Sequence, residues 1–224
     1  MKTISAVINA RKGSTRVENK LLRPFYNSSL IEIALSKLNN MNFFDKRYLA
    51  VAEDEFKILL KNYKNIELLP RDKNAVKKGV NPLTQTFAHY LNVPTDFVFV
   101  FNPCLPCIKI NSIKKAFDYF QKTNYKSYTA VVKTGDWIFD SEGKPLTNND
   151  PNNATTNKNM SFYKACHAFH IIDKQRFKDQ KVLWDFKIND PHLIEIDYSD
   201  SADVDTIEEF LLAEKLYKDQ VDKI

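Results

Sequence analysis

The chain has 224 residues, of which 43% are apolar and 27% are charged. These values are ordinary for a folded protein with one sizeable core, and they exclude a largely disordered chain. The formal net charge is +5, and the chain has no block of five or more basic residues. The mild basic excess suits a small acidic ligand as well as a polyanion, and the absence of a basic block argues against a nucleic-acid-binding module. We therefore expect residues 1–224 to form a single domain.

The three cysteines, Cys104, Cys107 and Cys166, are too few and too odd in number for a disulfide framework. A reducing compartment fits them better. The apolar stretch from Ile4 to Ile8 is too short for a signal peptide, and no apolar run approaches the length of a membrane span. We therefore expect a cytoplasmic protein that binds neither membranes nor nucleic acids.

Short apolar, partly β-branched runs alternate along the chain with segments of helical periodicity. We predict strands at residues 4–10, 48–52, 66–69, 97–101, 129–132, 165–172 and 193–196. We predict helices at residues 29–38, 54–63, 82–91, 112–120 and 207–218. The run at residues 97–101 has no polar break, which is typical of a central parallel strand that helices cover on both faces.

Three of the predicted helices begin with a recognisable cap. Ser29 and Glu32 have the spacing of a capping box. Asn81 precedes Pro82, which is the pattern of an N-cap followed by proline at the first helical position. Asn111 is the candidate N-cap of the next helix. These residues mark the expected helix starts.

The alternation of strands and helices predicts an α/β fold with a mostly parallel sheet flanked by helices. In such sheets, ligands bind at the carboxyl ends of the strands. This rule directs attention to the loops that follow Ala10 and Phe101 and to the loops after the last strands.

The alternation breaks at residues 133–163, where glycines and prolines punctuate the chain. Within this stretch, residues 148–159 are nearly all Asn, Asp and Thr and show no apolar periodicity. Such a segment indicates either a mobile loop or an excursion that docks on a partner.

A cationic loop, Arg11 to Lys20, leaves the first predicted strand. Gly13 permits an unusual backbone conformation, and successive backbone N–H groups near Ser14 and Arg16 can form an anion nest. Arg11 can bind two phosphate oxygens at once, and Lys20 can act as a point charge. The loop matches neither the Walker A pattern nor the G-x-G-x-x-G fingerprint. It indicates a phosphate-binding loop, and a solvated basic turn is the alternative.

Two carboxylates, Asp203 and Asp205, precede the last predicted helix. Residues two apart in an extended segment point the same way, so both side chains lie on one face. Two carboxylates that act together with substrate phosphates are a usual way to hold Mg²⁺. Alternatively, Asp205 caps the helix, because Glu208 follows at capping-box spacing. The two roles can coexist.

A third constellation follows the most apolar strand and reads Asn102-Pro103-Cys104-Leu105-Pro106-Cys107. Its C-x-x-C pattern has only Cys166 and His167 to complete a zinc site, and its two prolines stiffen an extended loop. We therefore disfavour a zinc or thioredoxin-like role. The order of the histidines suggests no Ser/His/Asp arrangement, so His89, His167, His170 and His192 fit structural roles better than catalytic ones.

Taken together, these loops resemble the acylneuraminate cytidylyltransferases, the enzymes that make CMP-sialic acid. The family pattern A-R-x-x-S-x-R/G-x-x-x-K-N is similar to residues 10–20, and S-I-D-I-D-T-x-x-D is similar to residues 201–209. Weaker likenesses lie between them: V-S-T-D at residues 51–54, Arg-Pro at 70–71, Q-P-T-S-P-L-R at 102–109 and N-G-A-x-Y at 166–170. The resemblance covers almost the whole chain, and its first and last motifs are the most specific.

The resemblance implies a Rossmann-like nucleotidyltransferase fold and transfer of CMP from CTP to an acidic sugar, as in surface polysaccharide biosynthesis. It implies that the co-substrate CTP is bound by Ala10, Arg11, Gly13, Ser14, Arg16, Lys20 and Arg71. Asp203 and Asp205 would hold Mg²⁺ and, with Arg11 and Lys20, form the catalytic set. The sugar would contact Asn102, Lys164 and His167. The excursion at residues 133–163 would be a dimerisation segment, which makes a homodimer the expected assembly.

The departures from the family pattern fall on the sugar side. Asn102 stands where the family has glutamine, His167 stands in the Asn-Gly pair, and Lys164 replaces an arginine that grips the sugar carboxylate. Lysine is not a bidentate substitute for arginine. We therefore expect CTP use with an open choice of acceptor: another nonulosonate, 3-deoxy-manno-octulosonate or a different acid. A CTP-binding protein without turnover is the remaining alternative.

Overall fold

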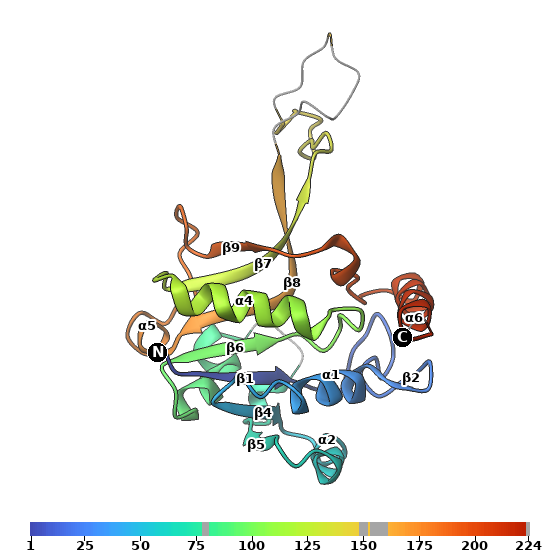
Figure 1. The fold of residues 1–224 in the computed structure, drawn as a ribbon, viewed down its shortest axis with the longest axis vertical. Helices are drawn as coiled ribbons and strands as arrows, with labels where there is room; N and C mark the ends of the chain where they lie inside the picture. Colours follow the sequence, from blue (N-terminus) through green and yellow to red (C-terminus); the bar gives the residue numbers. More distant parts are fainter. Residues whose placement is uncertain (78–80, 148–151, 153–160, 223–224) are drawn as a thin grey trace.

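A computed structural model describes residues 1–77, 81–147, 152 and 161–222. Its centre is a seven-stranded sheet of order β5-β4-β1-β6-β8-β7-β9 (Figure 1). The strands are β1 (Ile4–Asn9), β4 (Lys46–Val51), β5 (Glu67–Pro70), β6 (Phe97–Phe101), β7 (Ser127–Thr134), β8 (Phe162–Asp173) and β9 (His192–Glu195). Every strand of this sheet except β8 runs in one direction. The predicted α/β fold with a mostly parallel sheet is confirmed.

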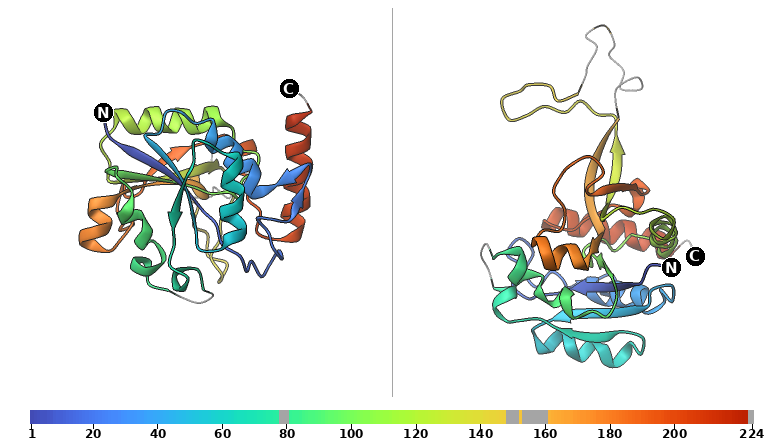
Figure 2. Two further views of the ribbon diagram at one scale, coloured as in Figure 1. Left: turned by 90° about the horizontal axis from the view of Figure 1, so that it is seen from below. Right: turned by 90° about the vertical axis from the view of Figure 1, so that its left-hand side faces the viewer.

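Helices cover both faces of this sheet (Figure 2). They are α1 (Leu30–Asn39), α2 (Asp54–Leu59), α3 (Leu83–Thr86), α4 (Ile110–Lys122), α5 (Lys174–Gln180) and α6 (Ile207–Val221). A small ribbon of β2 (Pro24–Phe25) and β3 (Ser28–Ser29) precedes α1. One apolar cluster joins the sheet to α1, α4 and α6, and a second joins it to α5 and the 3₁₀ turn Ala88–Asn92.

Strand β6 lies at the middle of the sheet, as its uninterrupted apolar sequence predicts. Phe99 and Phe101 pack into the cluster on the α1 and α4 face, and Val98 packs into the cluster on the other face. Phe99 also stacks on Phe169 of β8, with ring centroids 5.0 Å apart. Burial on both faces holds rigid the strand whose carboxyl end leads into the candidate site.

The predicted helix starts have mixed outcomes. Ser29 is confirmed as the N-cap of α1, because its hydroxyl accepts the N–H of Glu32. The prediction for Asn81 is wrong, since Pro82 itself has the extended conformation of an N-cap and the helix stops at Thr86. The prediction for Asn111 is wrong as well, since Lys109 is the N-cap of α4 and Asn111 lies inside the helix.

The outer parts of β7 and β8 project from the body of the molecule, and the described residues 133–147 and 161–163 are called the arm below (Figures 1 and 2). The predicted break in the alternation coincides with this arm, because β7 ends at Thr134 and β8 begins at Phe162. Most of the Asn-rich stretch, residues 148–151 and 153–159, lies outside the described residues. In the part of the chain that is described, no helix is long and apolar enough to cross a membrane.

Candidate active site

Three segments that are far apart in the sequence meet beside the carboxyl ends of β1 and β6. They are the cationic loop after β1, the loop after β6, and residues 203–206 before α6. The backbone N–H of Val204 donates to the carbonyl oxygen of Cys104 at 3.1 Å, which ties the last two segments together. Lys20 Nζ donates to the carbonyl oxygen of Val204 and brings in the first segment. The site therefore lies where the parallel sheet predicts it.

A cavity of about 330 Å³ lies between the cationic loop and the loop after β6. Its lining includes most of the predicted phosphate-binding residues: Asn9, Arg11, Gly13, Ser14, Thr15, Arg16, Lys20, Leu21, Asn102, Pro103 and Cys104. Gly13 has φ +85°, and no atom would lie within 4 Å of a Cβ placed on it. Glycine is needed here for its backbone conformation rather than for space. Three cations and a left-handed turn suit this cavity to a polyphosphate.

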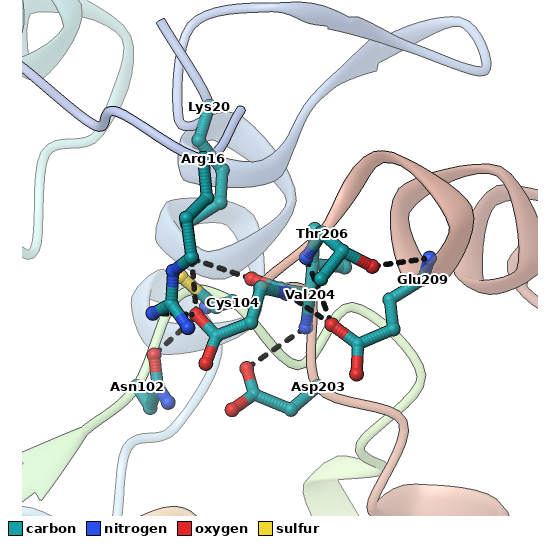
Figure 3. Close-up of polar contacts among 9 residues, drawn as sticks. Arg16, Lys20, Asn102, Cys104, Asp203, Val204, Thr206 and Glu209 are labelled. Atoms are coloured by element: carbon teal, nitrogen blue, oxygen red, sulfur yellow. Dashed lines mark hydrogen bonds and ion pairs between the residues drawn. The ribbon is translucent and has the colours of Figure 1, made fainter. Parts of the chain in front are cut away.

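Asp205 binds two of these cations at once. Its Oδ1 lies 2.9 Å from Arg16 Nη2 and 3.2 Å from Lys20 Nζ. Figure 3 shows Arg16 and Lys20 next to Cys104 and the 203–209 segment. Burial by itself would lower the pKa of Lys20, but its contacts with Cys104 and Asp205 outweigh burial and raise that pKa. Lys20 is therefore a fixed positive charge, whereas Arg16, whose side chain is 66% exposed, is free to turn toward a ligand.

The prediction that Asp205 caps the last helix with Glu208 is wrong by one residue. Thr206 is the N-cap of α6, and its Oγ1 accepts the N–H of Glu209 at 3.2 Å. Glu209 in turn accepts the N–H groups of Thr206 and Asp205, each at 2.8 Å. The Thr206–Glu209 capping box leaves the carboxylate of Asp205 to Arg16 and Lys20.

Asp203, like Asp205, is partly buried. Its Oδ1 accepts the N–H of Val204 at 2.9 Å (Figure 3). Burial and the nearby charge of Asp205 raise the pKa of Asp203. A buried carboxylate whose pKa is raised in this way, with a second carboxylate beside it, is a donor set that a divalent cation would neutralise, with phosphate oxygens and water completing its shell. Within the described residues, no group of three or more His, Cys, Asp and Glu side chains is placed to hold a metal.

Burial raises the pKa of the Cys104 thiol to about 11, despite the opposing effect of Lys20. The thiol therefore stays protonated at neutral pH. Its side chain lies against the cationic end of Lys20, inside the smaller cavity. Cys104, Cys107 and Cys166 are all free cysteines.

A second cavity, of about 1160 Å³, opens at the base of the arm. Its charged lining residues are Lys133 of β7, Lys164 of β8, Asp136, Asp203, Asp205 and Glu209. Asp205 also contacts Arg16 and Lys20 of the smaller cavity, so it links the two cavities, and Asp203 lies beside it in the lining of the larger one.

The structure separates the three residues that the resemblance assigned to the sugar. Lys164 and His167 line the larger cavity. Asn102 lines the smaller cavity instead, and its Oδ1 accepts the N–H of Cys104 at 3.0 Å. Asn102 thus shapes the loop after β6 on the side of the cationic loop.

Arg71 and Ala10 lie behind the cationic loop. Ala10 is 1% exposed, and its carbonyl oxygen accepts a hydrogen bond from Arg71 Nη1 at 3.4 Å. Arg71 Nη2 donates to the carbonyl oxygen of Thr86 at 3.3 Å. Neither residue lines the two cavities described above, so the structure gives them a supporting position; their contact with the nucleotide stays a prediction.

Asn9 is a cavity-lining residue that the sequence analysis did not single out. Its side-chain oxygen lies 2.8 Å from His89 Nε2, and its amide donates to the hydroxyl of Tyr90. Burial lowers the pKa of His89 to about 3, so the imidazole is neutral and its Nε2–H donates to Asn9. Asn9 could have been recognised from the sequence as a polar residue at the carboxyl end of a predicted buried strand.

Comparison with solved structures finds the same fold in nucleotide-using enzymes. CMP:2-keto-3-deoxy-manno-octonic acid synthetase, solved in complex with CTP, superposes with a TM-score of 0.68 at 11% identity, over 99% of this chain and 100% of the other. 4-Diphosphocytidyl-2C-methyl-D-erythritol synthase from Anaerococcus prevotii gives 0.66 at 18% identity, over 97% and 96%. The bifunctional IspDF from Campylobacter jejuni gives 0.60 at 16% identity, over 92% and 53%.

Identities this low show the fold alone. A comparison with curated proteins finds no match. A family model described as cytidylyltransferase, however, matches residues 5–216, which contain the cationic loop, both cavities and the carboxylate pair. The chain therefore belongs to the cytidylyltransferase family of CTP-dependent nucleotidyltransferases.

Proposed function

We propose that this protein transfers CMP from CTP to a hydroxyl group of a small acidic sugar and releases pyrophosphate. The observation that carries the proposal is a pair of cavities that Asp205 links, because it lines the larger one and contacts two cations of the smaller one. The smaller cavity offers three cations and a glycine turn, and the larger one offers two lysines beside four carboxylates. One cavity thus suits a triphosphate, and the other suits an acid.

On the nucleotide side, Arg11, Arg16 and Lys20 would bind the phosphates. Lys20 is already held in place by Val204 and Asp205, so it loses little side-chain freedom when the ligand binds. Arg11 is exposed, and its contact with the carbonyl oxygen of Val76 is long, at 3.5 Å, so it can turn toward the phosphates. Positioning and charge neutralisation of this kind are the main requirements of phosphoryl and nucleotidyl transfer.

On the acceptor side, the larger cavity carries charges of both signs. Lys133, Lys164 and Asp136 come from the base of the arm, and Asp203, Asp205 and Glu209 come from the start of α6 and the segment before it. An acid would place its carboxylate near the lysines and its reacting hydroxyl near Asp203 and Asp205. That orientation points the hydroxyl toward the α-phosphate of a nucleotide in the smaller cavity.

The reaction forms one bond and breaks one. The acceptor oxygen bonds to the α-phosphorus while the bond to the bridging oxygen breaks, and pyrophosphate leaves with that electron pair. The hydroxyl proton is released to solvent. Asp203 and Asp205 would hold Mg²⁺, which when bound neutralises phosphate charge and lowers the pKa of the hydroxyl. Lys20 keeps a positive charge beside the same phosphates.

The acceptor is best described as a nonulosonate-like acid, as in the acylneuraminate enzymes. 3-Deoxy-manno-octulosonate is the second candidate, and the fold that the chain shares with CMP:2-keto-3-deoxy-manno-octonic acid synthetase is compatible with it. Lys164 fits either acid, since a lysine contributes a point charge rather than a bidentate contact.

We also infer that the protein acts in the cytoplasm as a homodimer paired through the arm, whose Trp137 and Phe139 are about half exposed.

The acceptor assignment is tested by steady-state pyrophosphate release with CTP, Mg²⁺ and a panel of sugars, each supplied as the acid and as its neutral amide. We expect turnover only with acids. In K164M we expect the KM for the acid to rise about tenfold, as for the loss of a charged contact worth about 1.5 kcal/mol, with the KM for CTP unchanged. K178M, which removes an exposed lysine from α5, is the control. Equal turnover of acids and amides would contradict the acidic acceptor, and tight CTP binding without release would favour a protein that has lost turnover.

A further inference from the structure

Two asparagine amides lie at the carboxyl ends of neighbouring strands near the middle of the sheet. Ile8 of β1 pairs with Phe101 of β6, and Asn9 and Asn102 are the residues that come next in the two segments. Both asparagines line the smaller cavity. Since parallel strands lie about 5 Å apart, the two side chains are close enough to contact one small group of a ligand together.

The amide of Asn9 is held at both ends by side chains on the 3₁₀ turn Ala88–Asn92. Nε2–H of His89 donates to its oxygen at 2.8 Å, and its nitrogen donates to the hydroxyl of Tyr90. His89 and Tyr90 are 4% and 1% exposed, and Tyr90 stacks on Phe87 with ring centroids 5.1 Å apart. An amide nitrogen carries two hydrogens, so one N–H of Asn9 is left. An amide held in this way presents the same atom to every ligand.

The amide of Asn102 is oriented by the loop that follows β6. Its oxygen accepts the backbone N–H of Cys104 at 3.0 Å (Figure 3). A backbone N–H can only donate, so the oxygen has to face the loop, and the amide nitrogen is the end left for the cavity. The oxygens of Asn9 and Asn102 are thus both engaged within the protein. What the pair offers to a ligand is two N–H donors.

The two asparagines are neutral, unlike the cationic loop that lines the same cavity. Charged groups suit phosphates, whereas neutral amides suit the edge of a nucleobase. N3 and O2 of cytosine are adjacent hydrogen-bond acceptors. In uracil, O2 is unchanged, but N3 carries a hydrogen and donates. A pair of N–H donors therefore matches cytosine and opposes uracil.

We propose that Asn9 selects cytosine, with its remaining N–H donating to N3 of the base and Asn102 donating to O2. His89 and Tyr90 are positioning residues for Asn9. We assign N3 to Asn9 because this atom distinguishes the two pyrimidines, and discrimination requires an amide that cannot turn its oxygen to the ligand. A uracil ring would set its N3–H against that of Asn9 and leave both without a partner, which costs more than a lost contact. The inference rests on the nucleotide side of the proposed function.

The substitution N9D reverses the hydrogen bonding at this position with little change of shape. A carboxylate still accepts from His89, and the hydroxyl of Tyr90 can rotate to donate to its second oxygen, so both holding contacts are kept. By titration calorimetry with Mg²⁺ and no sugar, we expect the ratio of the Kd for UTP to the Kd for CTP to fall at least about tenfold. The added charge weakens both triphosphates alike and cancels in this ratio. N42D, the same change at an exposed asparagine that binds Arg47, should leave the ratio unchanged.

Two further measurements test the atom and its positioning. 3-Deazacytidine triphosphate has C–H in place of N3 and keeps O2 and the amino group. We expect the wild type to bind it about tenfold more weakly than CTP, as for one lost hydrogen bond, and N9D to bind it at least as tightly as CTP. Y90F removes the hydroxyl that accepts from Asn9 and keeps the ring against Phe87. It should lower the UTP-to-CTP ratio by a smaller factor than N9D, whereas a purely structural role would change stability and leave the ratio as it is.

The outcomes separate this inference from the proposed function. A wild type that prefers CTP, together with an unchanged ratio in N9D, would overturn the inference and leave the proposed function intact. Equal losses of CTP and UTP in N9D would also overturn it, because Asn9 would then contact the phosphates or the ribose, which the two nucleotides share. If the wild type binds no nucleotide, the proposed function fails and this inference fails with it.

Discussion

Asp205 has a dual position, because it binds Arg16 and Lys20 while facing the cavity where a divalent cation would be held. Arg16 is exposed, so its ion pair with Asp205 is worth little by itself and is easily exchanged. The same residue can therefore neutralise Asp205 in the free protein and turn to the phosphates when nucleotide and metal arrive. Lys20 is buried and does not have this freedom.

Removing Arg16 should make the metal site easier to fill in the absence of nucleotide. We expect R16Q to bind Mn²⁺, used as a probe for Mg²⁺, up to about fivefold more tightly than wild type, since an exposed ion pair contributes up to about 1 kcal/mol. Titration calorimetry without CTP measures this directly. K12Q removes a cation of the same loop that pairs with Glu55 instead, and it should bind Mn²⁺ as wild type does. Identical affinities in R16Q and wild type would show that Arg16 does not compete for Asp205.

The buried histidines should make the protein less stable in acid. The folded pKa values of His89 and His170 are lowered by burial to about 3 and about 4, below the ordinary 6.5. Because the unfolded state then binds protons first, the stability they contribute is complete above pH 6.5 and falls as the pH drops. Between pH 6.5 and 5.5 we expect a loss of about 1 kcal/mol for each histidine.

Urea unfolding at a series of pH values tests whether the free energy of unfolding falls as the pH drops below 6.5. H89Q keeps an amide that can donate to Asn9 but cannot titrate, so its stability should fall less steeply over the same range. A slope in H89Q as steep as in wild type would mean that other groups, rather than His89, set the acid sensitivity.

At the scale of elements, the start of α6 decides where the two carboxylates point. Glu208 and Glu209 are neighbours in the first turn, but only Glu209 accepts the N–H groups of Asp205 and Thr206. We expect E209A to lower the free energy of unfolding by about 1 kcal/mol, and E208A to change it by less than about 0.5 kcal/mol. Chemical denaturation of both variants gives the comparison, and equal losses would contradict the capping box.

The same helix start shows what sequence reasoning can and cannot decide. Asp205 and Glu208 have capping-box spacing, and so do Thr206 and Glu209. The spacing alone cannot choose between them; the choice depends on the extended backbone of Thr206 and on the cations that hold Asp205. The sequence pattern thus located the helix and its type of cap but assigned the cap to the wrong residue.

Strand and helix positions in the α/β core were predictable because burial there follows a simple period. The all-apolar run of β6 lies at the centre of the sheet, as expected. Two features had no local signal. The antiparallel direction of β8 depends on the path of the chain through the arm, and the left-handed backbone of His167 depends on the pairing of β7 with β8. Both are long-range properties, which periodicity does not record.

At the scale of the whole molecule, the described part of the arm projects from the body (Figure 1), and three of its apolar side chains are about half exposed. Trp137, Phe139 and Leu146 are 47%, 51% and 55% exposed. Exposed aromatic groups on a projecting element are typical of a protein interface. In the proposed homodimer, this apolar surface of the arm would pack against a second copy of the chain.

We expect sedimentation equilibrium to give twice the mass of one chain for the wild type, and the mass of one chain for a W137E/F139E double variant. Two charges buried in an apolar interface would cost more than a modest dimer gains. The F186S/I188S variant is the control, because these residues are even more exposed but lie outside the arm. A monomeric wild type, or a dimer that survives W137E/F139E, would contradict pairing through the arm.

The candidate active site forms only in the folded molecule, where the sheet brings together the cationic loop, the loop after β6 and residues 203–206. The cationic loop and the carboxylates were recognisable from composition and spacing, since phosphates and divalent cations require those residue types. The division into two cavities was not recognisable from the sequence. Asn102 follows β6 and Lys164 lies in β8, two neighbouring strands, and only the folded chain shows that the two residues line different cavities.

The most direct test of the central claim is pyrophosphate release with Mg²⁺ and each of the four nucleoside triphosphates, in wild type and in D203N, across a panel of acidic sugars. We expect release with CTP alone, and a loss of at least about 100-fold in kcat/KM in D203N, since that variant removes the charge of one of the two carboxylates that we propose hold Mg²⁺. Release with another nucleotide in preference to CTP, or full activity in D203N, would contradict this assignment of the two cavities and the two carboxylates.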